Sequence, residues 1–464
     1  MLMCISSAVT APVMAAPEAG PSDLSLPLPP PPLPPGTAMQ TTDYAQRVER
    51  ELRDDILHFW IAHTVDHECG GFFGEISNDL VIKKNAPRGA LLTSRILWTY
   101  SAAYRRYNDA AYLEMAHWAY NDLIKHFWDE DNGGLFWSIT ADGKPLKVEK
   151  QVYGQVFGIY ALAEFFRATQ EPEALSRATR IYHLIEAHAH DDTYGGYFEV
   201  CTRDWQPIRE PKQRPTTSKG RAADSAPSTE KSRPVQGVSA METYGSKSQN
   251  THLHILEAFT NLLRVWPDVG LHKSQSELIE LMLTKIIDPR THHLILFMND
   301  DWSPRSDGIS FGHDIEVSWL LTEAAAVVGG QALRERVKAA SLEIARVTLE
   351  EGLDTDGSLL YEAGPKGVTD RKREWWPQAE AAVGFYNAYQ LSHEERYLRA
   401  SFGVWDYIET HLIDHKNGEW FRAITEDGVV SNQAKVSLWK CPYHNGRSCM
   451  ELVERLAAPT PARE

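Results

Sequence analysis

The 464-residue sequence lacks any apolar run of about 18 residues, the length that a membrane-spanning helix needs. Cysteine is scarce: Cys4, Cys69, Cys201, Cys441 and Cys449 are far apart and without metal-site spacing. This usage favours reduced thiols in the cytoplasm over disulfides or zinc. Basic residues are outnumbered by acidic ones, 47 to 63, and the net charge of −16 repels phosphate backbones and anionic lipid. We therefore expect no nucleic-acid partner and no membrane partner.

Two stretches lack the composition of a packed core. The first 38 residues contain ten prolines but no aromatic residue, lysine or arginine, so they predict a disordered tail. The start also lacks the basic residues of a secretory signal peptide, which again favours a cytoplasmic protein. Between about 208 and 246, Pro, Ser, Thr, Lys and Arg dominate and predict a flexible insertion. With a short C-terminal tail at 458–464, one main domain over 39–457 is expected.

The rest of the sequence contains a repeated turn that precedes aromatic or apolar residues. The markers of these six segments are Phe72, Phe136, Tyr197, Phe297, Leu360 and Trp420. They are separated by 64, 61, 100, 63 and 60 residues, and the longest interval holds the insertion. This spacing predicts six units that cannot bury their own apolar faces and must pack against one another.

Between the markers, apolar residues follow a helical period, as in Leu92, Ile96, Tyr100, Ala103 and Tyr107. Each interval has room for two helices of ordinary length. Six helical hairpins predict an all-α fold, an (α/α)6 barrel with an inner and an outer layer and short β-hairpins at one end. An open superhelix is the alternative, because the pattern does not determine whether the ring closes.

Several helical segments carry polar residues where an inner helix should be apolar. Asn250 and His254 are four residues apart and therefore share a helical face. His313 and Glu316 are three apart, and Trp319 lies one turn further on. A carboxylate on the same face as a histidine can orient the imidazole and raise its basicity. These residues are therefore candidate acid/base groups.

Further candidates lie in three other segments. His444 lies in a segment broken by proline and glycine, which predicts a loop, where catalytic residues concentrate. Trp376 and Glu380 lie where a helix is expected to begin, and Arg95 is a cation in an apolar helical segment that requires a partner. Metal binding is the competing chemistry, but the sequence has no HExxH motif and no paired CxxC motif, so we expect no metal.

Five ordered motifs together resemble the N-acylglucosamine 2-epimerase superfamily, and within it most closely the cellobiose 2-epimerases. The motifs are Thr93-Ser94-Arg95, Asn250-Thr251-His252-Leu253-His254, Gly312-His313-Asp314-Ile315-Glu316, Trp375-Trp376-Pro377-Gln378-Ala379-Glu380 and Lys440-Cys441-Pro442-Tyr443-His444-Asn445-Gly446-Arg447. The resemblance spans roughly 44–455 without the insertion. It implies an (α/α)6 barrel, in agreement with the six units counted above.

The resemblance also implies an activity: reversible inversion of C2 in the reducing-end glucose of a β-1,4-linked disaccharide such as cellobiose or lactose, without cofactor or metal. It implies an acid/base pair in His313 and His444, a ring-opening histidine in His254 with Glu316 as its carboxylate partner, and an arginine near the sugar oxygens in Arg95. The residues that it implies for sugar binding are Tyr153, Asn250, Trp319, Trp376, Glu380 and Trp439. The expected partner is thus a small disaccharide, and the expected oligomeric state is a monomer or weak homodimer.

This set of residues suits such a reaction. A proton beside a carbonyl leaves only if the resulting enediolate is stabilised, a role that Arg95 fits. Inversion needs a base on each face, and imidazoles with an ordinary pKa of about 6.5 supply both protonation states near neutrality. Alternatives within the superfamily are an N-acylglucosamine 2-epimerase and a mannose isomerase. More distant alternatives are an inverting glycoside hydrolase that uses Glu316 and Glu380, and a non-enzymatic binding protein.

Overall fold

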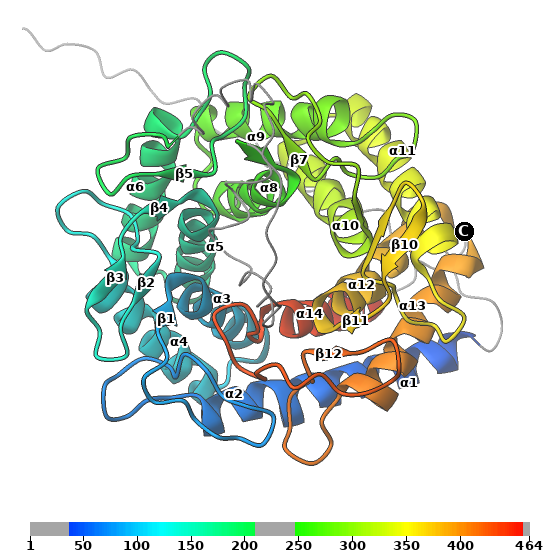
Figure 1. Ribbon diagram of the computed structural model, residues 1–464, viewed down its shortest axis with the longest axis horizontal. Coiled ribbons are helices and arrows are strands. Elements are labelled where there is room, and N and C mark those ends of the chain that lie inside the picture. The colour runs from blue at the N-terminus through cyan, green and yellow to red at the C-terminus, as the bar shows by residue number, and fades with distance from the viewer. Residues whose placement is uncertain (1–36, 209–245, 458–464) are drawn as a thin grey trace, which may run out of the picture.

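The helices of this protein form two concentric layers, as the computed structural model in Figure 1 shows. The structure describes residues 37–208 and 246–457. The inner layer consists of α3 (Ala90–Tyr107), α5 (Val152–Thr169), α8 (Gln249–Leu263), α10 (Phe311–Val328), α12 (Trp375–Ser392) and α14 (Tyr443–Ala457). Each inner helix packs against the next and α14 packs against α3, so the ring closes. The predicted (α/α)6 barrel is confirmed, and the open superhelix is wrong.

The outer layer pairs each inner helix with a partner. Its helices are α1 (Thr37–Arg50) with the short α2 (His58–His63), α4 (Ala110–Asp122), α6 (Pro172–His188), α9 (Val269–Leu281), α11 (Gln331–Val347) and α13 (Glu395–Tyr407). π-Helical turns follow several of them, at Glu51–Leu57, Leu123–Phe127, Met282–Ile286, Thr348–Gly352 and Ile408–Leu412. Five hairpins are continuous in sequence, and the sixth pairs α14 with α1. The two ends of the described chain therefore complete the barrel.

The terminal and inserted segments bear on the predicted domain limits. Helix α1 begins at Thr37, two residues inside the stretch that the composition assigns to the tail. The predicted insertion and the C-terminal tail lie outside the described residues, apart from the insertion's end residues Ile208 and Ser246. Residues 1–36 of the predicted disordered tail also lie outside the described residues, so the disorder of that tail and the flexibility of the insertion stay predictions.

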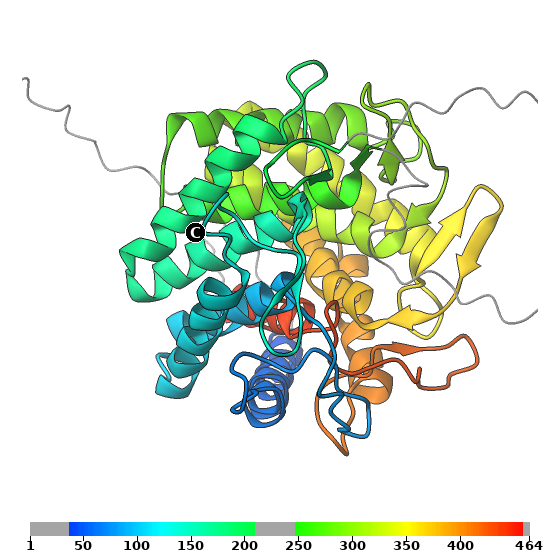
Figure 2. The same ribbon diagram turned by 60° about the vertical axis from the view of Figure 1, so that its left-hand side comes forward.

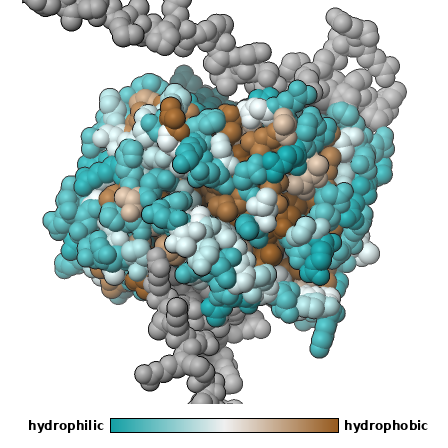
Figure 3. Space-filling model, turned by 90° about the horizontal axis from the view of Figure 1, so that it is seen from above, coloured by the Kyte–Doolittle hydropathy of each residue, from teal (hydrophilic) through white to brown (hydrophobic). Residues whose placement is uncertain are grey.

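Burial explains why these segments adopt two layers. In α12 every residue from Trp375 to Tyr389 is buried, whereas α13 buries only part of its surface. A helix that is apolar all round belongs inside, and an amphipathic one belongs at the surface. Figure 3 shows hydrophilic residues over much of one face of the barrel, with a band of hydrophobic residues between them. Within the two described ranges, no helix is both long and apolar enough to cross a membrane.

Short strands gather at the end of the barrel where the inner helices begin. They are β1 (Arg88–Gly89), β2 (Ser138–Ile139), β3 (Pro145–Lys147), β4 (Lys150–Gln151), β5 (Val200–Cys201), β6 (Lys247–Ser248), β7 (Phe297–Met298), β8 (Ile309–Ser310), β9 (Glu362–Gly364), β10 (Gly367–Asp370), β11 (Arg373–Glu374) and β12 (Ala423–Ile424). The antiparallel sheets are β1-β2-β3, β4-β5, β6-β7, β8-β9-β10 and β11-β12. The hairpin β9–β10 projects from this end (Figure 2). The predicted β-hairpins at one end are present.

The six repeated turns have a common construction. Each marker segment forms an isolated bridge to the end of the preceding outer helix, for example Trp128 with Leu135 and Ile413 with Trp420. An aspartate opens each turn, and in five of the six a Lys or Arg from the strand or loop that follows contacts it. These pairs are Arg88–Asp66, Lys150–Asp129, Lys247–Asp191, Arg373–Asp354 and Lys435–Asp414. The sixth aspartate, Asp288, has Ile309 at the corresponding strand position.

We expect Lys247→Met to destabilise the barrel strongly. The Lys247 ammonium is fully buried and donates to Asp191 at 2.7 Å and to the carbonyls of Gly195 and Asp300 at 2.8 and 2.7 Å. Its removal leaves the Asp191 carboxylate buried without its cation, a change that typically costs about 3–5 kcal/mol. Denaturant unfolding measures the loss. The control is Lys273→Met, which breaks an exposed pair with Glu277 and should leave stability almost unchanged.

Candidate active site

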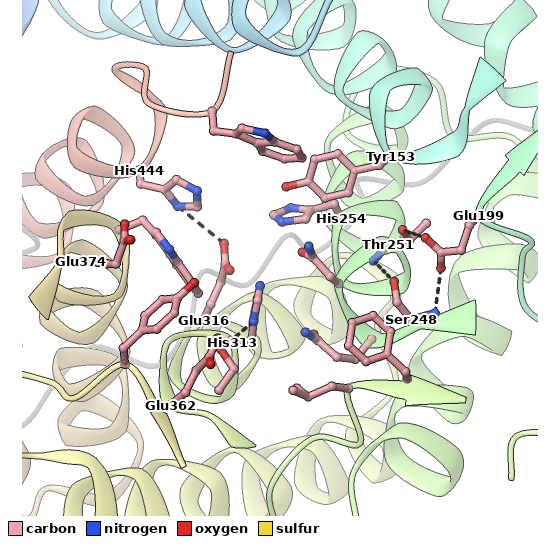
Figure 4. Close-up of a pocket in the computed structure, with 18 of the residues that line it drawn as sticks. Tyr153, Glu199, Ser248, Thr251, His254, His313, Glu316, Glu362, Glu374 and His444 are labelled. Atoms are coloured by element: carbon pink, nitrogen blue, oxygen red, sulfur yellow. Dashed lines mark hydrogen bonds and ion pairs between the residues drawn. The ribbon is translucent and has the colours of Figure 1, made fainter. Parts of the chain in front are cut away.

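A cavity of about 340 Å³ lies between the first turns of the inner helices (Figure 4). Small-molecule sites typically enclose about 300–1,000 Å³. The predicted site residues that line it are Arg95, Tyr153, Asn250, His254, His313, Glu316, Trp376, Trp439 and His444. All six inner helices contribute to this set, because each begins at the same end of the barrel. Of the predicted site residues, only Trp319 and Glu380 are not in the lining.

Arg95 brings a buried cation to the cavity wall. Its Nη2 donates to the Tyr153 hydroxyl at 2.9 Å and its Nη1 to the Trp439 carbonyl at 3.4 Å. The rings of Phe157 and Tyr443 lie 4.3 and 4.7 Å from the guanidinium carbon. Among the described residues its Nε has no hydrogen-bond partner, and the groups that act on its charge are Tyr153, Cys441 and Tyr443 rather than a carboxylate. The charge is therefore held in place by neutral groups and stays available to an anionic oxygen in the cavity.

His254 is oriented by a carboxylate, but not by the one that the resemblance implies. Its Nδ1 donates to Glu257 Oε2 at 2.9 Å, and Glu257 Oε1 accepts from the Tyr443 hydroxyl. The expectation that Glu316 partners His254 is wrong, because Glu257 lies one helical turn away on the same face. With its proton on Nδ1, the neutral ring presents Nε2 as its basic nitrogen.

His313 is held by a hydroxyl group. Its Nδ1 forms a hydrogen bond with Ser310 Oγ at 2.8 Å, at the end of β8. Its ring lies 4.7 Å from that of Trp376, measured between centroids. Gly312 permits this contact, since a Cβ there would come within 2.5 Å of the Trp376 ring. The predicted pairing of His313 with Glu316 is wrong, because Glu316 contacts Arg447 instead.

His444 is helical rather than in a loop, which corrects the sequence prediction. It is the second residue of α14, and Pro442 precedes the first turn, where a proline costs a helix nothing. Its Nδ1 donates to Glu380 Oε1 at 2.6 Å, and its ring lies 5.6 Å from that of Trp376. His313 and His444 thus contact the same indole and share one cavity.

Trp319 and Glu380 lie outside the cavity lining, and their role as sugar-binding residues stays a prediction. Glu380 is completely buried, and its Oε2 accepts from Trp319 Nε1 at 3.1 Å. The Trp319 ring packs 4.8 Å from the guanidinium of Arg447. Through Glu380, these two side chains are linked to the ring of His444.

Arg447 is the functional residue that sequence reasoning missed. Its Nη1 donates to Glu257, and its Nη2 donates to the Oε1 atoms of Glu316 and Glu380, both at 2.7 Å. One guanidinium thereby joins three buried carboxylates, two of which orient His254 and His444. The available signal was its position three residues after His444, which places both on one face of a helix.

One cluster among the described residues has the composition of a metal site: Glu316, Glu380 and His444, with potential ligand atoms within 4.8 Å of one another. Arg447 already bonds the Oε1 atom of both glutamates, and His444 Nδ1 bonds one of them. The positive charge of this cluster therefore comes from a guanidinium, and three of its potential ligand atoms, Glu316 Oε1, Glu380 Oε1 and His444 Nδ1, are already engaged in hydrogen bonds.

Other buried polar atoms at the cavity have no hydrogen bond within the described chain, although Arg422 Nε and Glu374 Oε2 form an ion pair at 3.9 Å. They are Gln151 Nε2, Gln249 Oε1, Asn250 Oδ1, Glu316 Oε2, Glu374 Oε2, Trp375 Nε1 and Arg422 Nε. A buried polar group without a hydrogen bond is costly. Together with the indole of Trp439 and the ring of Tyr153, these atoms give the cavity the mixture of flat apolar faces and hydrogen-bonding groups that a sugar requires.

Burial changes the acid/base properties that the sequence suggested. It lowers the pKa of His254 to about 4, although the hydrogen bond to Glu257 acts in the opposite direction. It lowers the pKa of His313 to about 3. Burial and the nearby charges of Arg95 and Arg447 hold the pKa of His444 well below its ordinary value. Burial therefore keeps these imidazoles neutral at pH 7 in the folded protein, whereas the sequence predicts titration near neutrality.

These shifts predict a loss of stability in mild acid. Below the ordinary imidazole pKa of about 6.5, His254 and His313 become protonated in the unfolded chain but stay neutral in the folded protein. Each group then destabilises the fold by about 1 kcal/mol per pH unit until the pH reaches its folded pKa. We expect denaturant unfolding of His313→Gln between pH 7 and about 5 to show a shallower pH dependence than the wild type. An equal slope would contradict the buried, neutral imidazole.

Comparisons with known proteins agree with this geometry. The family model described as N-acylglucosamine 2-epimerase (GlcNAc 2-epimerase) matches residues 71–217 and 228–446. A cellobiose 2-epimerase of Bacteroides fragilis is 41% identical over 410 residues, which cover 88% of this chain and 98% of the relative. The human N-acylglucosamine 2-epimerase is 24% identical over 436 residues, which cover 89% and 90%.

A solved structure has a similar fold. The cellobiose 2-epimerase of Bacillus thermoamylovorans superposes with a TM-score of 0.80 at 37% identity, covering 89% of this chain and all of that one. The family model spans well over half of the sequence, and it includes the segments that supply His254, His313 and His444. This chain therefore belongs to the N-acylglucosamine 2-epimerase family.

Proposed function

We propose that this protein is a cellobiose 2-epimerase, which reversibly inverts C2 of the reducing-end glucose in β-1,4-linked disaccharides. One observation carries the proposal: His254, His313 and His444 each use Nδ1 in a hydrogen bond inside the protein, so Nε2 of each is the ring nitrogen left for a ligand in one cavity. The similarity to cellobiose 2-epimerases of 34–41% identity over almost the whole barrel supports this choice within the family.

The reaction requires an open-chain sugar, because only the aldehyde form acidifies the proton at C2. His254 is the proposed ring-opening group. Its Nε2 exchanges a proton with the anomeric hydroxyl, and the Glu257 carboxylate behind it stabilises the imidazolium that forms. Trp376, Trp439 and Tyr153 are proposed to hold the sugar by its apolar faces, and Asn250 by a hydroxyl group.

Inversion at C2 then needs one neutral and one protonated imidazole. His313 is the proposed base for one face, since its only fixed partner is a hydroxyl and its pKa is low. His444 is the proposed acid for the other face: it is neutral in the free protein, takes a proton from solvent at Nε2 when the sugar binds, and the Glu380 carboxylate on its Nδ1 stabilises the resulting imidazolium. Arg95 stabilises the enediolate between the two steps. In the reverse reaction the histidines exchange roles.

The carboxylates do not favour an inverting hydrolase. Such an enzyme separates its acid and base by roughly 6.5–9.5 Å across the scissile bond. Potential ligand oxygens of Glu316 and Glu380 lie within 4.8 Å of each other on the same guanidinium, and Glu380 does not line the cavity. The set of histidines with free Nε2 atoms likewise argues for catalysis over binding alone.

Proton NMR of cellobiose incubated with EDTA-treated protein in heavy water tests the proposal. We expect glucosyl-mannose with deuterium at C2, because the transferred proton passes through exchangeable imidazoles. Unchanged cellobiose and lactose, with turnover of N-acetylglucosamine-type sugars or free mannose instead, would favour an N-acylglucosamine 2-epimerase or a mannose isomerase. Release of free glucose would indicate hydrolysis.

The proposal extends to the working state of the enzyme. We propose a monomer or weak homodimer in the cytoplasm that acts without cofactor or metal. The described cysteines, Cys69, Cys201, Cys441 and Cys449, are all free thiols, as is typical of a reducing compartment. The net charge of −16 supports a small-molecule partner over nucleic acid.

A further inference from the structure

Arg447 contacts the carboxylates of Glu257, Glu316 and Glu380, and these three groups differ in how many hydrogen bonds they accept. Glu257 accepts from His254 Nδ1 at Oε2, and from the Tyr443 hydroxyl and Arg447 at Oε1. Its two oxygens therefore face only donors, as an ionised carboxylate requires. The nearby positive charge of Arg447 and the bond from His254 hold the pKa of Glu257 at about 2 in spite of burial.

Both oxygens of Glu380 also accept hydrogen bonds. Its Oε1 accepts from His444 Nδ1 at 2.6 Å and from Arg447 Nη2 at 2.7 Å, and its Oε2 accepts from Trp319 Nε1 at 3.1 Å. Burial raises the pKa of Glu380 above its ordinary value, and the charge and hydrogen bond of Arg447 act in the opposite direction. Because both of its oxygens meet donors, the hydrogen-bond pattern assigns Glu380 as the second ionised carboxylate.

Glu316 differs from both. Its Oε1 accepts from Arg447 Nη2 at 2.7 Å, but its Oε2 is buried and has no hydrogen-bond partner among the described residues. The side chain lines the cavity and lies where two other carboxylates already use the single guanidinium. A bare carboxylate oxygen in such a place is costly, and like charges that share a site force one group to keep its proton.

We infer that Glu316 is held as the neutral carboxylic acid, with its proton on Oε2, and that it donates a hydrogen bond into the cavity to the C1 or C2 oxygen of the open-chain sugar. This role rests on the proposed epimerase function and extends it. A buried carboxyl group kept neutral in this way can serve as a hydrogen-bond donor to an enolate-type oxygen. The neutral Glu316 donor complements Arg95, because it stabilises the negative oxygen of the enediolate by a hydrogen bond without adding a charge to the cavity.

Burial and the charge of Glu380 raise the pKa of Glu316 well above its ordinary value, in agreement with the hydrogen-bond pattern. The charged or titratable groups that face it are Arg447, His444 and Tyr443 from α14, Glu380 from α12, Glu257 from α8 and Tyr153 from α5. Among the described residues, Arg447 is the one cation that contacts the ionised carboxylates of Glu257 and Glu380. The proton on Glu316 therefore keeps a third negative charge out of the cluster.

The test compares Glu316→Gln with Glu316→Leu. Glutamine keeps an acceptor for Arg447 and a donor at the Oε2 position, so we expect kcat on cellobiose within about tenfold of the wild type. Leucine removes the donor, and we expect a loss of about 10²–10³-fold, as for removal of one oxyanion-stabilising hydrogen bond. Equal, large losses in both variants would overturn the inference, because the group would then be needed as a charge or a proton carrier.

Infrared difference spectroscopy supplies a readout that does not depend on turnover. The wild-type minus Glu316→Gln spectrum of the ligand-free protein at pH 7 should contain the carbonyl band of a protonated carboxyl group. Glu380→Gln is the matched control and should remove only carboxylate bands. Absence of the protonated band for Glu316 would overturn the inference even if the protein is an epimerase. A protein that shows the band but turns over no sugar would instead refute the proposed function and the donor role that rests on it.

Discussion

His313→Asn should abolish epimerisation of cellobiose while leaving hydrogen exchange at C2 in one of the two epimers. In the proposed reaction His313 and His444 act on opposite faces of C2, so each epimer presents its proton to only one of them. Asparagine retains a polar atom near the position of Nδ1, which contacts Ser310, but removes the basic Nε2. Loss of one acid/base group typically costs about 10²–10⁴-fold, and inversion needs both groups.

The matched variant is His444→Asn, which should preserve exchange in the other epimer. The measurement is deuterium incorporation at C2, followed by NMR from cellobiose and, separately, from glucosyl-mannose in heavy water. Circular dichroism and thermal unfolding establish that both variants are folded. If both variants exchange the same epimer, a single histidine serves both faces and the two-base assignment is wrong.

The helical barrel could be predicted from the sequence because the turns and the apolar period that produce it are local features. Turns that place Gly133 and Gly134 at φ of 72° and 70° recur with a fixed spacing, and the helical apolar period between them is visible without tertiary information. What no local pattern contains is the closure by α1 and α14, whose residues lie about 400 positions apart in the chain. The six-unit count made a closed ring plausible, and packing of the chain ends decided it.

The candidate site was harder to predict in detail. Helical spacing identified which side chains share a face, but not which neighbour each one contacts. His313 and Glu316 share a face, yet Glu316 turns to Arg447 on another helix, and His313 turns to Ser310 in the preceding strand. Likewise the sequence predicts that Glu380 and Trp319 bind the sugar, although neither side chain lines the cavity and the two contact each other. Contacts between helices, such as His444 with Glu380, depend on the crossing of α12 and α14 and leave no trace in either segment alone.

The pKa shifts were equally inaccessible from sequence. The sequence shows imidazoles beside carboxylates, which suggests raised basicity. In the structure burial outweighs that effect for His254, whose pKa falls although Glu257 bonds its Nδ1. Desolvation depends on the depth of the cavity, which is a property of the closed barrel.

Arg95→Met should lower kcat for epimerisation by about 10²–10³-fold with a much smaller change in KM, the size expected when one charge-stabilising group at an oxyanion is lost. The guanidinium is held by the Tyr153 hydroxyl and the Trp439 carbonyl, and within the described residues its charge partners are Tyr153, Cys441 and Tyr443 rather than a carboxylate. No anion of the described chain therefore neutralises the charge of Arg95 until negative charge develops on the sugar. Methionine has a similar length and apolar packing, so it should still fit between Phe157 and Tyr443.

The isotope assay separates this role from that of the histidines. The enediolate is common to both directions of the reaction, so Arg95→Met should slow C2 exchange in cellobiose and in glucosyl-mannose by the same factor, whereas each histidine variant affects the two epimers unequally. Tyr153→Phe is the control, since it removes one fixed acceptor of Arg95 but keeps the cation, and should cost less than Arg95→Met. An Arg95→Met variant that raises KM and leaves kcat intact would show that the arginine binds the ground-state sugar and that another group, for which Glu316 is the candidate in the same cavity, stabilises the enediolate.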